Sequence, residues 1–205
     1  MQLTREVFTQ IYENNFWGSP ESVSGPGSEI GQTETLIGEL NILLDKMGIK
    51  SILDLPCGDL NWMRKVNLSG INYVGADIVV EIISNNTSRF GCHANMKFEV
   101  LDLITDPLPE CDLVIVRDCL VHLSYDDISK AIANIKSSCS KYLLATNFVD
   151  HRQNHDIKTG DWRPLNLLEP PFRLTSPILT INENCTEDGG KYADKSMALW
   201  CISDI

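Results

Sequence analysis

The sequence predicts a doubly wound α/β domain on a mostly parallel, seven-stranded sheet with an antiparallel last strand. Three observations support this fold class. Five short apolar runs, each bounded by turn residues or acids, have the length of buried parallel strands. Segments of helical length or periodicity separate several of these runs, as in βαβ units with right-handed crossovers. The 205 residues, 43% of them hydrophobic, are enough for one such domain, so we expect residues 1–205 to form a single unit.

The first element expected is an arm over residues 1–32. It contains FWGSPESVSGPGSE, whose Gly, Ser and Pro residues do not propagate a helix or a strand. We expect a partly helical, structured arm or a flexible lid. A helix is predicted next, from Gln32 to Met47, because its apolar residues recur with a 3.6-residue period and Gly48 ends it.

The central elements follow in order. The strands are expected at residues 51–55, 73–77, 97–101, 112–116 and 142–146, and the helices at 61–66, 79–89 and 126–138. Beyond them, 178–181 and 198–202 are strand-like and predict a closing antiparallel pair at the sheet edge.

Residues 150–171, between the fifth and sixth strands, have a composition that does not favour a helix. Irregular segments of this length inside a compact domain are usually binding loops or lids. The mixed charges of the segment suit a polar, hydroxyl-bearing substrate. We therefore expect a substrate loop here, with an ordinary solvated loop as the alternative.

The charge balance bears on possible partners. Seventeen Lys and Arg against 28 Asp and Glu give a net charge of −11, which disfavours a nucleic-acid partner. The first residues are too polar for a secretory signal, and no run approaches the roughly 18 apolar residues of a membrane span. The seven cysteines form neither a CxxC pair nor a zinc-like Cys/His cluster. We expect a cytoplasmic monomer or homodimer with reduced thiols, no metal site and no membrane partner.

The binding site is expected at the carboxyl ends of the strands. The first strand runs into LDLPCGDLNW, which keeps only Gly58 of the dinucleotide fingerprint G-x-G-x-x-G. Asp54 and Asp59 bring negative charge to a turn that would have to accept a pyrophosphate, so a ligand with positive charge is favoured. S-adenosylmethionine, with its ammonium and sulfonium, is such a ligand. Asp77 ends the second strand at the spacing typical of an acid that binds ribose hydroxyls, and Asp102 follows the third.

Four stretches together resemble class I S-adenosylmethionine-dependent methyltransferases, which have a Rossmann-like sheet: SILDLPCGDLNWM, YVGADI, FEVLDL and DLVIVRDCLVHLS. The resemblance covers nearly the whole chain. IYENNFWGSPESVSGPGS and DIKTGDWRPLNL also resemble a small bacterial subgroup of these enzymes, associated with surface-glycan or small-metabolite modification. The sequence departs from the usual family loop at Pro56 and Leu60, where glycines are commoner.

By this resemblance, the cofactor residues lie in the arm and at the carboxyl ends of the first four strands. They are Trp17, Ser28, Asp54, Pro56, Cys57, Gly58, Asp77, Ile78, Asp102, Leu103, Arg117 and Asp118. The resemblance implies that Asp54 and the backbone near Gly58 hold the methionine part. It assigns the ribose hydroxyls to Asp77, and the adenine to Asp102 with Leu103. Each acid has a structural alternative, as a helix cap at a strand end.

The activity expected is S-adenosylmethionine-dependent methylation, with a hydroxyl of a small polar metabolite or saccharide as the acceptor. A hydroxyl nucleophile gains from a nearby base. Asp161 and His155 are the first candidates for this base, and His122 is the third, although His122 also fits a structural histidine.

Three alternatives stay open. The first is a noncatalytic protein that binds S-adenosylmethionine or another nucleoside on the same fold. The second is an NAD-dependent reductase, for which we would expect glycines at positions 56 and 60 and no acid at 59. The third is a polynucleotide methyltransferase, which the net charge of −11 disfavours.

Overall fold

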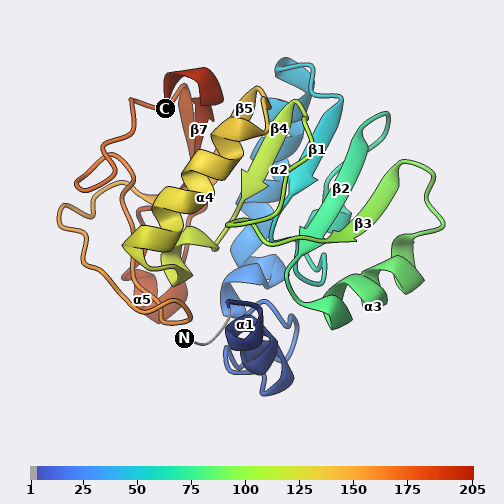
Figure 1. Ribbon diagram of the computed structural model, residues 1–205, viewed down its shortest axis with the longest axis horizontal. Coiled ribbons are helices and arrows are strands. Elements are labelled where there is room, and N and C mark those ends of the chain that lie inside the picture. Colours follow the sequence, from blue (N-terminus) through green and yellow to red (C-terminus); the bar gives the residue numbers. More distant parts are fainter. Residues whose placement is uncertain (1–3) are drawn as a thin grey trace.

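Seven strands form one sheet, in the order β3-β2-β1-β4-β5-β7-β6, in the computed structural model, which describes residues 4–205 (Figure 1). The strands are Ser51–Asp54 (β1), Asn72–Asp77 (β2), Met96–Val100 (β3), Leu113–Val116 (β4), Tyr142–Phe148 (β5), Leu179–Asn182 (β6) and Lys195–Cys201 (β7). Strands β1 to β5 pair in parallel, whereas β7 pairs antiparallel with both β5 and β6. The predicted fold class and the antiparallel pair at the edge are confirmed.

Helices cover both faces of this sheet. They are Thr4–Glu13 (α1), Ile30–Lys46 (α2), Val80–Phe90 (α3), Tyr125–Ser137 (α4) and the short turn Glu187–Gly190 (α5). Figure 1 shows α4 on the near face and α2 behind the sheet, with α1 beyond the carboxyl ends of the central strands. No helix among residues 4–205 combines the length and apolar character needed to cross a bilayer.

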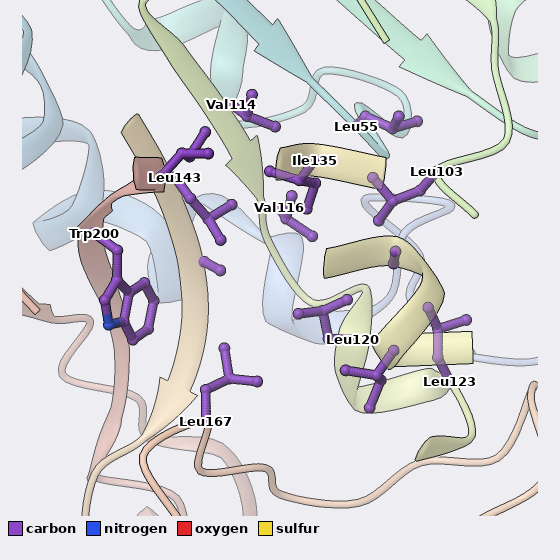
Figure 2. Packing of buried hydrophobic residues seen from close by; sticks show 14 of the residues in the cluster. Leu55, Leu103, Val114, Val116, Leu120, Leu123, Ile135, Leu143, Leu167 and Trp200 are labelled. Carbon is purple, nitrogen blue, oxygen red and sulfur yellow. The ribbon is translucent and has the colours of Figure 1, made fainter. Parts of the chain in front are cut away.

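The two faces form two apolar cores because side chains of a strand alternate in direction. In β4, Val114 and Val116 face the core that contains α4, together with Trp200 of β7 (Figure 2). Leu113 and Ile115 face the opposite core, which contains α2. All four residues of β4 are buried, and each such side chain contributes roughly 1.5–3 kcal/mol. The central strands are therefore fully packed on both faces, and their carboxyl ends form the base of the site.

Most elements lie within two residues of their predicted bounds, but one predicted helix is absent and one strand begins earlier. The segment 61–66 forms turns and a short 3-10 helix, Met63–Lys65, instead of an α-helix. It is short, and it is preceded by Leu60, whose φ of 57° is left-handed. Strand β7 begins at Lys195, before the predicted 198, because Lys195 is buried among ion-pair partners rather than exposed in the connecting loop.

The segment between β5 and β6 contains no helix, as predicted, and only an isolated bridge between Thr159 and Asp161. It is nevertheless fixed to the domain. Arg163, 1% exposed, donates to the main-chain oxygens of Leu120 at 3.0 Å and Leu123 at 2.7 Å. The loop is thereby tied to the turn that follows β4, one of the strands whose carboxyl end forms the site.

Candidate functional site

A cavity of about 1070 Å³, its open mouth included, lies between the carboxyl ends of β1 to β4 and the arm. All twelve residues predicted to bind the cofactor line it, and so does His122. Residues far apart in the sequence are thus brought together as the sequence analysis expected. Their individual roles stay predictions.

Asp77 is fixed by the backbone at the edge of this cavity. One carboxylate oxygen accepts the Val79 amide at 3.0 Å and the other accepts the Gly58 amide at 3.2 Å. Burial raises the pKa of Asp77 to about 6, although these two amides act in the opposite direction. The carboxylate therefore joins the loop after β1 to the start of α3. Each oxygen keeps a lone pair that can accept a hydroxyl.

Asp54 is also buried, and it accepts a hydrogen bond from the Tyr73 hydroxyl at 2.6 Å. Burial raises its pKa to about 7, against the opposing effect of that hydrogen bond. Near neutral pH the carboxyl is therefore only partly ionised. It carries less negative charge into the cavity than the sequence analysis assumed.

The second acid of the turn after β1, Asp59, holds the arm in place. Its carboxylate accepts the Ser22 hydroxyl at 2.9 Å and the Val23 amide at 3.1 Å. A second contact lies beside it, where the Asn61 side-chain amide donates to Glu21 at 2.5 Å. The charge of Asp59 was expected to repel a dinucleotide. The structure instead assigns this carboxylate to arm contacts.

The backbone of this loop needs two left-handed residues. Gly58 has a φ of 54°, and a Cβ there would collide with the Ser24 hydroxyl of the arm. Leu60, where the resembling family usually has glycine, keeps a φ of 57° and buries its side chain. Such a conformation costs a non-glycine residue roughly 1–2 kcal/mol, so the departure at Leu60 preserves the backbone shape at some cost.

A buried charge network joins the arm to the last strands. Arg117 contacts both carboxylate oxygens of Glu183, at 2.7 and 3.1 Å, and donates to the Gly27 main-chain oxygen at 2.7 Å. Lys195 pairs with Asp118 at 2.7 Å. Burial alone would raise the pKa of Asp118, but the ammonium of Lys195 and the guanidinium of Arg117 hold it below its usual range. These groups are satisfied by one another.

A second cavity, of about 810 Å³ with its mouth, adjoins the first. The two share four lining residues: Trp17, Ser24, Asp118 and His122. The rest of its lining comes from the Gly25–Gly27 segment of the arm, β5, the loop after β5, α5, Tyr192 in the turn after α5, and the start of β7. The site therefore has two compartments that meet at these four residues.

His122 lies at this boundary, in the 3-10 turn Leu120–His122 after β4. Its Nδ1 is 2.9 Å from the main-chain oxygen of Asp161. A carbonyl can only accept, so Nδ1 carries the proton and the neutral ring has its lone pair on Nε2. Burial lowers the pKa of His122 below its ordinary value of 6.5. At pH 7 the ring is thus neutral and can accept a proton.

No family model matches the sequence, and neither does any curated protein. Solved structures do match. Magnesium protoporphyrin IX methyltransferase from Synechocystis PCC 6803, with bound S-adenosylmethionine, superposes with a TM-score of 0.56 over 77% of this chain and 80% of its own, at 14% identity. Human N-acetylserotonin methyltransferase gives a TM-score of 0.53 at 20% identity, over 72% of this chain. The match spans only 42% of the human enzyme.

The chain has the class I S-adenosylmethionine-dependent methyltransferase fold. Identities this low establish the fold rather than the substrate. Within this methyltransferase fold, the cavity at the carboxyl ends of β1 to β4 is the place where the sequence analysis expected the nucleoside.

Two of the three candidate bases lie outside both cavities of this methyltransferase fold. The side chains of Asp161 and His155 are exposed and line neither cavity. Both residues act through their main chains instead: Asp161 holds the His122 ring, and the His155 oxygen accepts from Arg163 at 3.2 Å. The loop turns its backbone inward and these two side chains outward. We assign neither of them a role in proton transfer.

Helix α1 also contributes to the first cavity, and its residues were not among those predicted from the sequence. Thr4, Phe8 and Tyr12 line the first cavity, and their four-residue spacing places them on one face of a helix. This spacing in TREVFTQIYE was the available signal. Within residues 4–205, no group of three or more His, Cys, Asp or Glu side chains is arranged to hold a metal ion.

Proposed function

We propose that the protein is an S-adenosylmethionine-dependent methyltransferase that methylates a hydroxyl of a small polar or saccharide-type acceptor. One observation carries this proposal: two cavities meet at Trp17, Ser24, Asp118 and His122. A transfer reaction needs two compartments whose contents touch at one boundary. Alignment of two reactants in this way supplies most of the catalysis available to a group transfer.

The residues of the first cavity fit S-adenosylmethionine. Asp77, held by two amides, would accept the ribose hydroxyls, and Asp102 with Leu103 would contact the adenine. Asp54 and the bare backbone of Gly58 would hold the methionine part. A cationic group beside Asp54 would favour its ionised form and offset its raised pKa.

When bound, S-adenosylmethionine supplies a methyl group whose bond to sulfur breaks, with the electron pair staying on sulfur, as the acceptor oxygen bonds to the carbon. The chain must then take the proton of the acceptor hydroxyl. His122 is our candidate for this step, because its Nε2 lone pair is available and its ring lines both cavities. Such a base typically contributes about 10²- to 10⁴-fold in rate.

The segment after β1 favours this cofactor over NAD. Dinucleotide sites place the pyrophosphate on the N-terminus of the helix that follows the first strand. Here the described residues between β1 and β2 form only the three-residue 3-10 helix Met63–Lys65. No α-helix among the described residues begins directly after this loop, and Leu60 takes the place of a glycine.

Calorimetric titration with S-adenosylmethionine, S-adenosylhomocysteine and NADH tests the proposal. We expect one molecule of either sulfur nucleoside to bind per chain. The substitution Asp77→Asn should lower the affinity for both at least tenfold. Asp45→Asn, which changes an exposed acid at the end of α2, is the matched control and should bind as the wild type does. An absence of heat at tens of micromolar protein, or tighter binding of NADH, would refute it.

A further inference from the structure

We infer that the second cavity is the acceptor pocket and that it selects a ring compound carrying a protonated amine, while rejecting carboxylates and phosphates. This inference rests on the proposed function, because it takes the first cavity as the nucleoside site. It goes further in naming the charge and shape of the acceptor. The ionised residues that line the pocket are three carboxylates and one ammonium, namely Asp118, Glu187, Asp188 and Lys195.

The single ammonium of the pocket is already neutralised. Lys195 is 4% exposed, and its Nζ lies 2.7 Å from Asp118 and 3.7 Å from Glu183. An entering anion would have to compete with both carboxylates for this group. Asp118 is engaged in return, by Lys195 and by Arg117 at 3.3 Å. The pocket therefore offers no free cation from the residues that line it.

Glu187 and Asp188, in contrast, enter no ion pair with any of residues 4–205. They lie in α5, where Asp188 has a φ of 50°, so this is a tight turn rather than a regular helix. A Cβ on Gly27 of the arm would lie 3.3 Å from a Glu187 carboxylate oxygen. Glu187 thus faces the arm across the pocket. Lys191, at the end of the same turn, is exposed and does not line the pocket, but its Nζ lies 5.1 Å from the centroid of the Tyr192 ring. The Trp162 ring is therefore the aromatic surface left for a cationic ligand.

Aromatic rings form the other wall. Phe148, Trp162 and Tyr192 pair with one another edge to face, with ring centroids 5.0 to 6.2 Å apart. Phe148 is buried, whereas Trp162 is 42% exposed although it packs in this cluster. Ring faces attract cations and stack on flat or ring-shaped ligands. Glu187 accepts the Cys185 thiol at 3.4 Å but forms no ion pair. Carboxylates outside any ion pair, in one pocket with aromatic rings, are a recognition surface for an amine attached to a ring.

This arrangement also orients the acceptor. The amine would be held at Glu187 and Asp188, and the ring would lie along the Trp162 and Tyr192 wall. The hydroxyl to be methylated would then be directed to the boundary with the first cavity, where His122 lies. The two carboxylates act as specificity residues, and they take no part in the bond-making step.

Two matched probe series test the inference on protein saturated with S-adenosylhomocysteine. The first series is tyramine, tyrosol and 4-hydroxyphenylacetate, which are an amine, a neutral compound and an acid on a phenol ring. The second series is glucosamine, glucose and glucuronate, which carry the same three charges on a sugar ring. In the series that binds, we expect the amine to bind about tenfold more tightly than the neutral member, because charge-assisted contacts are the strong ones. The acid should bind more weakly than the neutral member. The series that binds identifies the ring as an arene or a sugar.

In the variant Glu187→Gln/Asp188→Asn, the affinity for the amine should fall to within about twofold of the affinity for the neutral probe, because both charges that lie outside an ion pair are removed. Glu34→Gln/Glu39→Gln, on the exposed face of α2, should keep the wild-type preference. An acid that binds as well as the amine, a variant that keeps the preference, or an absence of binding in both series would overturn the inference. Failure of S-adenosylhomocysteine to bind would refute the proposed function itself, and the two failures are therefore distinguishable.

Discussion

The Nδ1 atom of His122 lies 2.9 Å from the main-chain oxygen of Asp161, so one candidate base is positioned by the backbone of another. This contact fixes the tautomer of the buried ring and leaves the Asp161 carboxylate in solvent. Under the proposed function, the His122 ring takes the proton, and Asp161 contributes only the main-chain oxygen that orients this ring.

Replacing His122 by Asn should lower kcat by about 100-fold or more, because the proton acceptor is lost. Asp161→Asn keeps the main-chain contact with His122, so its kcat should stay within about twofold of the wild-type value. Formation of S-adenosylhomocysteine with the best-bound probe amine measures both. In the wild type, kcat should rise with pH and level off below pH 6.5, because burial lowers the pKa of His122. Equal losses in the two variants would contradict the assignment.

Cofactor affinity should increase with pH around 6. The pKa of Asp77 is raised to about 6, so the carboxyl is protonated at pH 5 and ionised at pH 7. Only the ionised form can accept hydrogen bonds from both ribose hydroxyls while it holds its two amides. Titration of S-adenosylmethionine at pH 5, 6, 7 and 8 should show weakening below pH 6. Asp77→Asn should remove this dependence, and a flat wild-type profile would contradict it.

The unliganded protein should lose stability as the pH rises. In the folded chain the pKa of Asp54 is about 7 and that of Asp77 is about 6, and both lie above the ordinary 3.8. At pH values between 3.8 and these raised values, the folded chain therefore binds more protons than the unfolded chain. The free energy of unfolding then falls as pH increases from about 4 to about 7, by about 1.4 kcal/mol for each unit of pKa shift. Urea unfolding at pH 5 and pH 8 measures this. Asp54→Asn should flatten the profile, whereas a wild type more stable at pH 8 would refute the sign.

The close approach of Gly58 to Ser24 of the arm can be tested with single and double substitutions. Gly58→Ala should weaken cofactor binding about tenfold and expose the arm to limited proteolysis, because the new methyl group collides with the Ser24 hydroxyl. Adding Ser24→Gly should restore part of the loss but not all, since a φ of 54° still strains alanine. Gly38→Ala, in the middle of α2 with open space around it, is the control. A double variant no better than the single one would exclude the arm contact as the cause.

Most of the fold could be predicted from the sequence because buried strands have a strong local signature. The strand β4 is apolar throughout, and acids end β1 and β2 and follow β3 at positions that the topology brings to one cavity. The start of β7 could not be predicted. Lys195 and Ser196 are polar, and the burial of Lys195 depends on Asp118 and Glu183, which are distant in the sequence.

The site was harder to predict where direction matters more than residue type. His155 and Asp161 have suitable chemistry, but a sequence does not show that Arg163 draws the loop backbone inward. The charge of Asp59 was visible, whereas its contacts with Ser22 and Val23 depend on how the arm folds back. In each case the missing information was a contact between segments far apart in the chain.

The most direct test of the central claim is a crystal structure of the protein grown with S-adenosylhomocysteine. The account predicts the nucleoside in the first cavity, with its ribose hydroxyls on the Asp77 carboxylate and its sulfur facing the boundary at His122 and Asp118. A nucleoside bound elsewhere, or a diphosphate resting on Gly58 in crystals grown with NADH, would contradict it.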